Sequence, residues 1–577
     1  MQIRWAYLKR VLAGAIFGLY MAHLLYFLNP QVDVSPGRLA LVTILYGLIC
    51  GFLFGSLLWG LRALRVRLLG KPEAETYRAH GFGFVVLAAF IATAIYWIHL
   101  EVVRIYLPLG AVRILAKATN LITATSFALL LLWVAERNAT RRISRVIFVG
   151  GVFLIVASSL FLYQRRDSYR AEEHNMVVAN VGTVAGQRPI IVVAIRSLPY
   201  DWLLTIAGEG GLPFFDRARE HAYFTRMEPF PTTSERSLWA SLASGKLPYR
   251  HGVTGRFSYR TPLNGADPRE RFLLLPNGVG FQAWGLVPPV RRITSQGPAG
   301  DSLPFWMLFE RVALRASVLN WPWTQASGAS RVLTNDYFGA RDPRREVQPP
   351  EYLTTARRLR QLPSSAALAR FNITGAVRPQ IAEALAQDLT LTAMAGESAS
   401  DRNFGLDVVA LDGFSDAQRA LHIYLNDLPP RTSVKGEAIR AYVEQLDQML
   451  ATLARAHPDH LLVVVSPAGP SRPPLPATAW ALAREAILPV DPGADDGFVL
   501  ITGPGVTHHE NPRSAFEVDM VPTVLFAAGL PVGRDMDGRV LTDAFDDEFL
   551  RHNALTAIQT YEAQQVIVRR PNGATAQ

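Results

Sequence analysis

Long apolar stretches dominate the first 165 residues of the chain, and polar segments separate them. An α-helix rises about 1.5 Å per residue, so about 20 apolar residues cross the roughly 30 Å hydrocarbon core of a bilayer. Each stretch is about that long. The pattern therefore predicts five membrane-spanning helices, at residues 11–29, 39–61, 82–100, 118–135 and 146–163.

Basic residues between these stretches predict the orientation of the chain. The loop after the second stretch contains Arg62, Arg65, Arg67, Lys71 and Arg78, and the loop after the fourth contains Arg137, Arg141, Arg142 and Arg145. The other two loops are less basic. Because short cytoplasmic loops are enriched in Lys and Arg, we expect a cytoplasmic N-terminus in a bacterial inner membrane. The large part after residue 165 is then periplasmic or extracellular.

Two ionisable residues, His99 and Glu101, end the third stretch. An ionisable group inside a membrane is a candidate for function. At the end of a span, however, such side chains commonly extend toward water. We expect the second situation for both residues, and a packing role for His23 in the first stretch.

The rest of the chain alternates between strand-like and helix-like patterns. Apolar runs rich in β-branched or aromatic residues predict strands at 189–197, 422–426, 460–466 and 497–503. Helical spacing occurs between them, at 212–222 and 436–456. This alternation predicts a doubly wound α/β sheet. The expected organisation is a membrane region at 1–164, an irregular linker at 165–188 and an α/β domain at 189–577.

Charge and cysteine content exclude two classes of function. The net charge is +10, but residues 1–170 carry +13 and the remaining residues carry −3. The basicity therefore belongs to the membrane region, and we expect no nucleic-acid partner. Cys50 is the single cysteine, which rules out an internal disulfide and a thiolate metal cluster.

Several blocks of the α/β region resemble a known enzyme family. PTTSERSLWASLASGKLPYRHG at 231–252 is similar to a nucleophile segment followed by a helix and Pro-x-x-His-Gly. Residues 302–324 and the TGPGV…DMVPTVL…GLPV…DMDGR series within 502–541 are similar to two later blocks. Together they resemble the type I phosphodiesterase/nucleotide pyrophosphatase branch of the alkaline phosphatase (sulfatase-like) superfamily.

The resemblance implies an alkaline-phosphatase-like fold and a site with two divalent metals, zinc or manganese. Such metals activate a Thr or Ser nucleophile and bind the phosphoryl oxygens, held by Asp and His at strand ends. The first strand should end in Asp-Gly, but it reads Arg196-Ser197. The nucleophile position falls on Glu235, with Ser234 one residue earlier.

The later ligand positions depart from the family as well. The Asp and the His four residues after it align with Asp427 and Arg431, after the strand expected at 422–426. The Asp-His-Gly after the next strand is replaced by Pro467-Ala468-Gly469, and the last His position falls near Gly493. We therefore predict a degenerate site without a metal pair.

Arg196 has two interpretations. Together with Arg431 and the helix N-terminus after Thr233-Ser234, it could bind phosphate or sulfate without a metal. Alternatively, it forms an internal salt bridge to Glu235 or Asp427 and fills the vacated metal space. We favour the salt bridge. Ser234 or Thr233 then caps the following helix.

Other chemically capable residues have simpler explanations. His251 is the first histidine after Ser234 in the sequence, but the resemblance implies a structural role for it. We expect a solvated loop for His508-His509-Glu510, and a plain turn rather than a calcium site for Asp491, Asp495 and Asp496. Trp239 is expected in the core.

Two functional hypotheses remain. The first is a membrane-anchored, non-catalytic envelope protein that acts in binding or assembly and needs no cofactor. Its partners would be another membrane protein subunit, a lipid-linked glycan or a phosphorylated glycan. The second is an active phosphodiesterase or phosphotransferase on phosphate esters of envelope lipid or glycan, with a rearranged site and two divalent metals.

Overall fold

The computed structural model describes most of the chain from residue 81 onward and single residues or short pieces before it. The described ranges are 81–137, 140–166, 178–181, 188–230, 234–253, 257–260, 291–294, 302–322, 329–422, 434–469, 495–562, 565–569 and 575–576. The chain divides into two compact units. The helical unit comprises Met1–Glu173, Tyr259–Ile293 and Glu485–Leu488, and the α/β unit comprises the rest.

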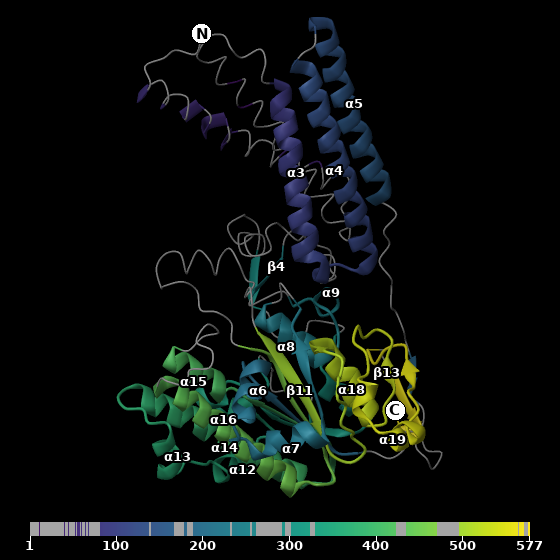
Figure 1. The fold of residues 1–577 in the computed structure, drawn as a ribbon. Helices are drawn as coiled ribbons and strands as arrows, with labels where there is room; N and C mark the ends of the chain where they lie inside the picture. The colour runs from purple at the N-terminus through teal and green to yellow at the C-terminus, as the bar shows by residue number, and fades with distance from the viewer. Residues whose placement is uncertain are drawn as a thin grey trace. The chain divides into compact units, whose positions relative to one another are not determined.

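Three long helices make up most of the described part of the helical unit (Figure 1). They are α3 (Gly81–Val103), α4 (Leu109–Arg137) and α5 (Arg141–Arg166), with the short helix η2 (Arg104–Tyr106) between the first two. They coincide with the last three predicted spans. Leu109–Glu136 and Arg145–Leu162 are long and apolar enough to cross a membrane, and α3 contains a shorter apolar segment, Ala89–Glu101. The first two predicted spans lie almost wholly outside the described residues, so five crossings remain a prediction.

Side-chain hydrogen bonds connect the three helices. The hydroxyls of Thr93 and Ser126 are 2.8 Å apart, and those of Thr125 and Ser158 are 2.9 Å apart. Bonds of this kind join helices in an apolar environment. His99, expected to extend toward water, is fully buried, whereas Glu101 is exposed. Helical periodicity explains the difference, because His99 lies on the same face as the fully buried Tyr96.

A nine-stranded mixed sheet is the centre of the α/β unit. Its order is β12-β3-β11-β10-β2-β9-β6-β7-β8. The central strands β10, β2, β9, β6 and β7 are parallel, whereas β11 is antiparallel to both β10 and β3. The strands are β2 (Ile190–Ile195), β3 (Tyr223–Glu228), β6 (Arg315–Leu319), β7 (Arg331–Leu333), β8 (Val347–Gln348), β9 (Phe404–Leu411), β10 (Leu461–Ala468), β11 (Asp496–Thr502) and β12 (Ala515–Phe516).

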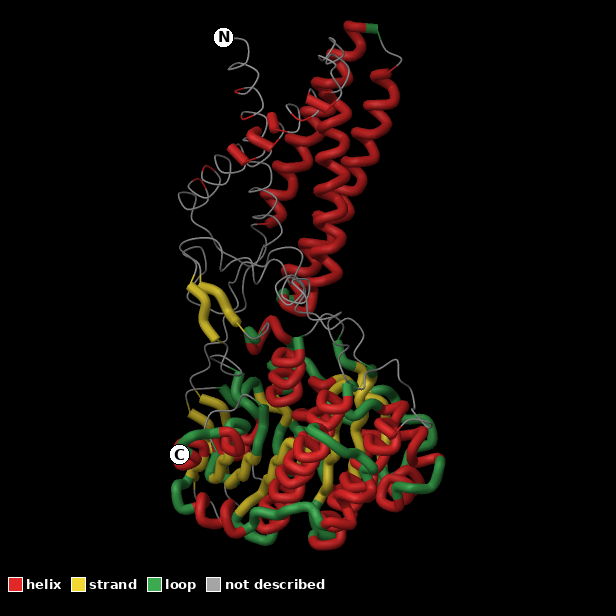
Figure 2. Tube along the Cα trace, turned by 90° about the vertical axis from the view of Figure 1, so that its left-hand side faces the viewer, coloured by secondary structure: helices red, strands yellow, loops and turns green. Residues whose placement is uncertain are grey.

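Helices cover both faces of this sheet, as the tube in Figure 2 shows. Successive side chains of β2 point to opposite faces. Ile190, Val192 and Ala194 pack with α8 (Glu235–Ser244), α11 (Phe305–Arg311) and α18 (Met520–Ala527). The alternate residues of β2 pack with α6 (Tyr200–Gly208), α7 (Pro213–His221), α14 (Val377–Ala399), α15 (Gly413–Leu421) and α16 (Val434–Ala456).

The remaining described elements are short. The helices are α9 (Pro248–His251), α12 (Tyr352–Arg358), α13 (Ser365–Arg370), α19 (Asp547–His552), η4 (Tyr337–Gly339), η5 (Pro343–Glu346), η6 (Glu517–Asp519) and η7 (Thr542–Ala544). The strands are β1 (Val178–Val181), β4 (Phe257–Arg260), β5 (Arg291–Thr294), β13 (Val532–Gly533), β14 (Ala557–Ile558), β15 (Gln565–Arg569) and β16 (Thr575–Ala576).

A buried ion cluster follows the end of α8. Gly245 ends the helix with φ of +68°, and the ammonium of Lys246 lies 2.6 Å from carboxylate oxygens of both Asp535 and Glu562. The Lys246 side chain is only 5% exposed. The Thr560 hydroxyl also donates to Asp535, at 2.9 Å. These contacts connect the segment 535–562 to the end of α8.

Several elements of the α/β unit that were predicted from apolar runs or helical spacing are confirmed. β2, β10, β11, α7 and α16 all lie close to their predicted ranges. Two predicted segments extend into residues that the structure does not describe. Within the expected linker 165–188, the described residues include the end of α5 and the strand β1, which pairs with β15. In the strand expected at 422–426, His422 instead ends α15 with φ of +53°, and 423–426 lie outside the described residues.

Candidate functional site

Three loops meet at the carboxyl ends of the parallel strands. Arg196 follows β2, and its N–H donates to the carbonyl of Leu411 at the end of β9, at 3.0 Å. Ser197 has φ of +65°, a conformation that favours glycine and that suits the Gly position of the resemblance. The N–H of Leu198 donates to the hydroxyl of Ser466 in β10, at 3.1 Å. This edge is where α/β sheets bind ligands.

Arg196 forms an ion-pair cluster at this edge. Its Nε lies 2.5 Å from Oε1 of Glu235, and its Nη1 lies 3.6 Å from Oδ1 of Asp412. The side chains are 17%, 40% and 13% exposed, respectively. Burial alone would lower the pKa of Arg196, but the two carboxylates raise it above its ordinary value. Arg196 therefore stays protonated among these carboxylates. The three residues Arg196, Glu235 and Asp412 are hereafter called the Arg196 cluster.

The expected salt bridge from Arg196 to Glu235 is present, and Arg196 also pairs with Asp412. Asp427 and Arg431 lie outside the described residues. Asp412 lies close to Arg196 because β9, rather than 422–426, is the strand beside β2. Asp412 and Asp416 also reproduce the four-residue spacing of the Asp and His in the resembled site. Sequence reasoning missed this signal by choosing the wrong strand.

The start of α8 places Glu235 against Arg196. Ser234 is the N-cap of this helix, and its hydroxyl accepts a hydrogen bond from the N–H of Ser237 at 3.2 Å. A serine at this position satisfies a backbone donor that the helix cannot pair internally. The capping role predicted for Ser234 is confirmed, and Thr233 lies outside the described residues.

Two asparagines hold Asp412 from the opposite side. The Nδ2 of Asn335 donates to Oδ2 of Asp412 at 2.8 Å, and the Nδ2 of Asn320 lies 3.4 Å from the same oxygen. Both residues follow neighbouring strands, β6 and β7. Burial raises the pKa of Asp412, and Arg196 opposes the rise. Asp412 is thus bound by protein donors on two sides.

Asp388 on α14 supports the backbone just after Asp412. Its carboxyl group accepts hydrogen bonds from the N–H of Gly413, at 3.1 Å, and from the hydroxyl of Tyr442, at 2.9 Å. A Cβ at Gly413 would collide with both of these side chains. Asp388 is fully buried, and burial raises its pKa from 3.8 to about 8, with small further increases from Asp412 and Asp416.

Asp388→Asn is expected to change the pH dependence of stability. Because the folded protein binds the Asp388 proton more tightly than the unfolded chain, this stabilisation is complete below about pH 4 and is lost as the pH rises toward 8. Asparagine keeps a partner for Gly413 and Tyr442 without ionising. The Tm of the variant should therefore match that of wild type near pH 4 and exceed it increasingly up to pH 8.

Thermal unfolding across this pH range measures the difference. Burial also raises the pKa values of Asp407 and Glu517. These groups titrate in both proteins, however, so they cancel in the comparison. Parallel pH profiles would show that an ionised Asp388 is tolerated.

His251 does not serve Ser234 as a base. Its Nδ1 accepts the N–H of Val253 at 3.1 Å, so its Nε2 carries the proton and donates to the hydroxyl of Ser241 at 3.0 Å. Burial, reinforced by Lys246, lowers the pKa of His251 to about 3. Its structural role is as expected. Trp239 is likewise buried, with its ring centroid 5.1 Å from that of Trp321.

The remaining candidates are not brought to the Arg196 cluster. His508, His509 and Glu510 lie exposed on a loop. Asp496 begins β11 and pairs with Arg226 at 2.7 Å, and Asp491 lies outside the described residues. Within the described ranges, His, Cys, Asp and Glu side chains form no group of three that could hold a metal ion.

The described residues at this edge do not fit a pair of divalent metals. A guanidinium contacts both Glu235 and Asp412, and it has no lone pair to donate. In the described part of the chain, the end of β10 adds Ser466, Pro467 and Ala468, and the Ser466 hydroxyl already accepts the N–H of Leu198. Gly493 lies outside the described residues.

Neither the family models nor the curated proteins contain a match to the chain. Among solved structures, alkaline phosphatase PafA is similar over 65% of this chain and 100% of that one, at 10% identity and a TM-score of 0.38. Phosphonoacetate hydrolase from Sinorhizobium meliloti 1021 is similar over 50% of this chain, at 16% identity and a TM-score of 0.31. This chain spans only 59% of that enzyme. The lipoteichoic acid synthase LtaP from Listeria monocytogenes is similar over 63% of this chain and 78% of that one, at 14% identity and a TM-score of 0.32. These likenesses are too remote to transfer an activity.

Proposed function

We propose that the protein is a membrane-anchored envelope protein whose α/β unit resembles a phosphodiesterase but acts in binding or assembly rather than hydrolysis. The Arg196 cluster carries this proposal. An arginine follows β2 where the resemblance requires a metal-binding aspartate, and it pairs with the residue at the nucleophile position. A phosphoryl-transfer site needs those positions for metal ligands and for a hydroxyl nucleophile.

Electrostatics explain why this cluster disfavours a dication. Two like unit charges about 4 Å apart repel by about 4 kcal/mol at an effective dielectric of about 20. A divalent ion between Glu235 and Asp412 would face the fixed charge of Arg196 at such a distance, with twice the charge. It would also have to displace the guanidinium from both carboxylates. Each carboxylate of the cluster therefore already has a cationic partner without an added ion.

The proposed location rests on the helical unit. Two described helices are long and apolar enough to span a membrane, and the net charge of +13 lies within residues 1–170. With five crossings and the most basic loops in the cytoplasm, the α/β unit would be periplasmic or extracellular. It would there meet another membrane subunit, a lipid-linked glycan or a phosphorylated glycan.

Metal content and hydrolysis test the proposal on the purified full-length protein. We expect no stoichiometric zinc or manganese and no turnover of a nitrophenyl phosphodiester above the level of Ser234→Ala and Glu235→Ala variants. Arg196→Asp is the matched positive control, because it places a third carboxylate beside Glu235 and Asp412. Manganese or zinc should raise the Tm of that variant but not the Tm of wild type.

Two results would support the active enzyme instead. One is about two equivalents of tightly bound zinc or manganese in the wild-type protein. The other is phosphodiester turnover that either Ser234→Ala or Glu235→Ala abolishes.

A further inference from the structure

A pocket opens beside the Arg196 cluster, at the carboxyl end of β7. Its volume is about 470 Å³, and it is formed by residues 335–346, which include parts of η4 and η5. Pockets of roughly 300–1,000 Å³ suit small ligands. Asn335 lines the pocket and also donates to Asp412. The pocket and the Arg196 cluster therefore share one side chain.

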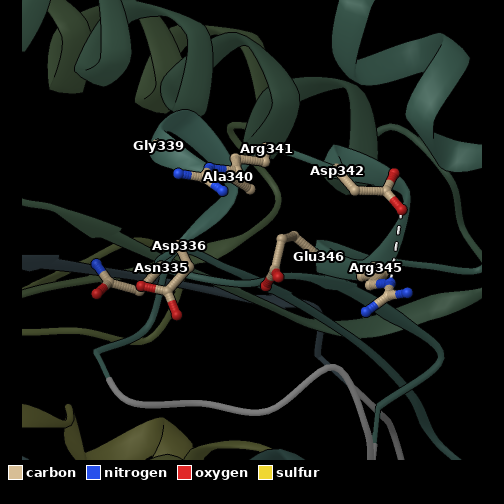
Figure 3. A pocket seen from close by; sticks show the side chains of 8 residues that line it. All are labelled: Asn335, Asp336, Gly339, Ala340, Arg341, Asp342, Arg345 and Glu346. Carbon is tan, nitrogen blue, oxygen red and sulfur yellow. Dashed lines mark ion pairs between the residues drawn. The ribbon is translucent and has the colours of Figure 1, made fainter.

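The pocket presents both positive and negative groups (Figure 3). Arg345 pairs with Asp342 on one side, with Nε and Oδ2 3.5 Å apart, and Asn335 and Asp336 lie on the opposite side. Glu346 lies between these sides and accepts the Thr334 hydroxyl. Among the described residues, neither Arg341 nor Asp336 has an ion-pair partner. Both are exposed and can reach a ligand.

Further arginines extend the positive side beyond the pocket. Burial raises the pKa of Tyr337 in η4, and the guanidinium groups of Arg357 and Arg360 are close enough to oppose that rise. Both arginines are exposed, and neither has an ion-pair partner within the described ranges. An anion approaching Arg341 therefore meets additional positive charge near η4.

This combination selects one class of ligand. Guanidinium groups bind phosphate and carboxylate well, but a bare anion would be repelled by Asp336 and Glu346. Those carboxylates accept hydrogen bonds from hydroxyl groups, but a neutral sugar would leave Arg341 unused. A molecule with several hydroxyls and one anionic group satisfies both sets.

We propose that the pocket formed by residues 335–346 binds an anionic sugar, with its phosphate or carboxylate at Arg341 and its hydroxyls at Asp336 and Glu346. The inference rests on the proposed binding function and gives that function a site and a ligand class. Phosphate and carboxylate share the chemistry that Arg341 recognises, so the experiment has an arm for each.

Calorimetric titration of the full-length protein in detergent tests the ligand class. The probes are glucose 6-phosphate, glucuronate, neutral glucose and inorganic phosphate. We expect one or both anionic sugars to bind at least about tenfold more tightly than glucose or phosphate, since hydrogen bonds to charged groups are stronger than those between neutral groups. The stronger of the two sugars identifies the anionic group.

Two variants assign the binding to this pocket. Arg341→Gln should lower the affinity for the anionic sugar by about tenfold or more. Arg551→Gln, on the exposed end of α19, should leave this affinity unchanged. Asp336 makes no side-chain cap to η4, so Asp336→Ala should fold normally. This variant should lower the affinity for the anionic sugar but not the affinity for inorganic phosphate. A loss confined to the sugar would show that Asp336 recognises hydroxyl groups and does not act through charge alone.

The outcomes distinguish this inference from the proposed function. No binding of either anionic sugar, or equal binding by wild type and Arg341→Gln, would overturn the pocket assignment while leaving the loss of catalysis untouched. Release of phosphate from glucose 6-phosphate, abolished by Glu235→Ala, would instead overturn the proposed function. Equal affinity for glucose and the anionic sugars would also refute the pocket assignment.

Discussion

Arg196→Met is expected to lower the free energy of unfolding of the α/β unit by about 3 kcal/mol, near the lower end of the range for breaking a buried ion pair. The variant leaves Asp412, which is 13% exposed, without its cation. Glu235 is 40% exposed, so water compensates for much of its loss. Denaturant titration of the purified protein, followed by tryptophan fluorescence, measures the change.

A triple variant provides the matched control. Adding Glu235→Gln and Asp412→Asn to Arg196→Met removes the charges but keeps the shapes, and the new amide at position 412 can still accept a hydrogen bond from Asn335. Replacing a whole buried ion cluster with neutral groups is often neutral for stability. The triple variant should therefore recover most of the loss. If it is as unstable as the single variant, packing by Arg196 rather than its charge stabilises this edge.

Lys246→Met should have a still larger effect, about 3–5 kcal/mol. It leaves Asp535 and Glu562 together without a cation, and their side chains are only 9% and 15% exposed. Burial already raises the pKa of Glu562, and Lys246 opposes that rise. Without Lys246, Glu562 should take up a proton more readily. The destabilisation should therefore shrink as the pH falls from 7 to 4, as thermal unfolding at the two pH values would show.

Arg358→Met is the control for this second prediction. Arg358 pairs with Glu397, but these side chains are 63% and 38% exposed. Exposed pairs contribute less than about 1 kcal/mol. Similar losses from Arg358→Met and Lys246→Met would contradict the assigned importance of burial.

The parts of the fold that could be predicted are those with uninterrupted local patterns. β2 and β10 are buried along their whole length, and α16 has helical spacing throughout. β9 was missed because Asp407 interrupts its apolar run, although the sheet buries this residue. Residues 422–426 look more like a strand by composition. Pairing with β2 and β6, which no local pattern reveals, decides where the strand lies.

The site was predictable to a similar extent. Arg196, Ser234 and Glu235 lie in segments whose resemblance fixed their positions, so their pairing and capping could be inferred. Asp412 depended on the correct choice of strand. Asn335 and Asp388 could not be found from the sequence, because their contacts join segments that are distant along the chain. The 335–346 pocket follows a three-residue strand with no distinctive pattern.

The position of β2 in the sheet has a consequence for biosynthesis. β2 lies between β9 and β10, whose residues are translated long after it. Until the ribosome has made residues 404–411 and 461–468, the apolar run 190–195 has neither neighbour. Such non-local pairing forms slowly, and the partly folded intermediates that precede it are prone to aggregate. A nascent chain stalled before residue 404 should therefore be aggregation-prone and depend on chaperones, whereas one extended past 468 can begin to close its sheet.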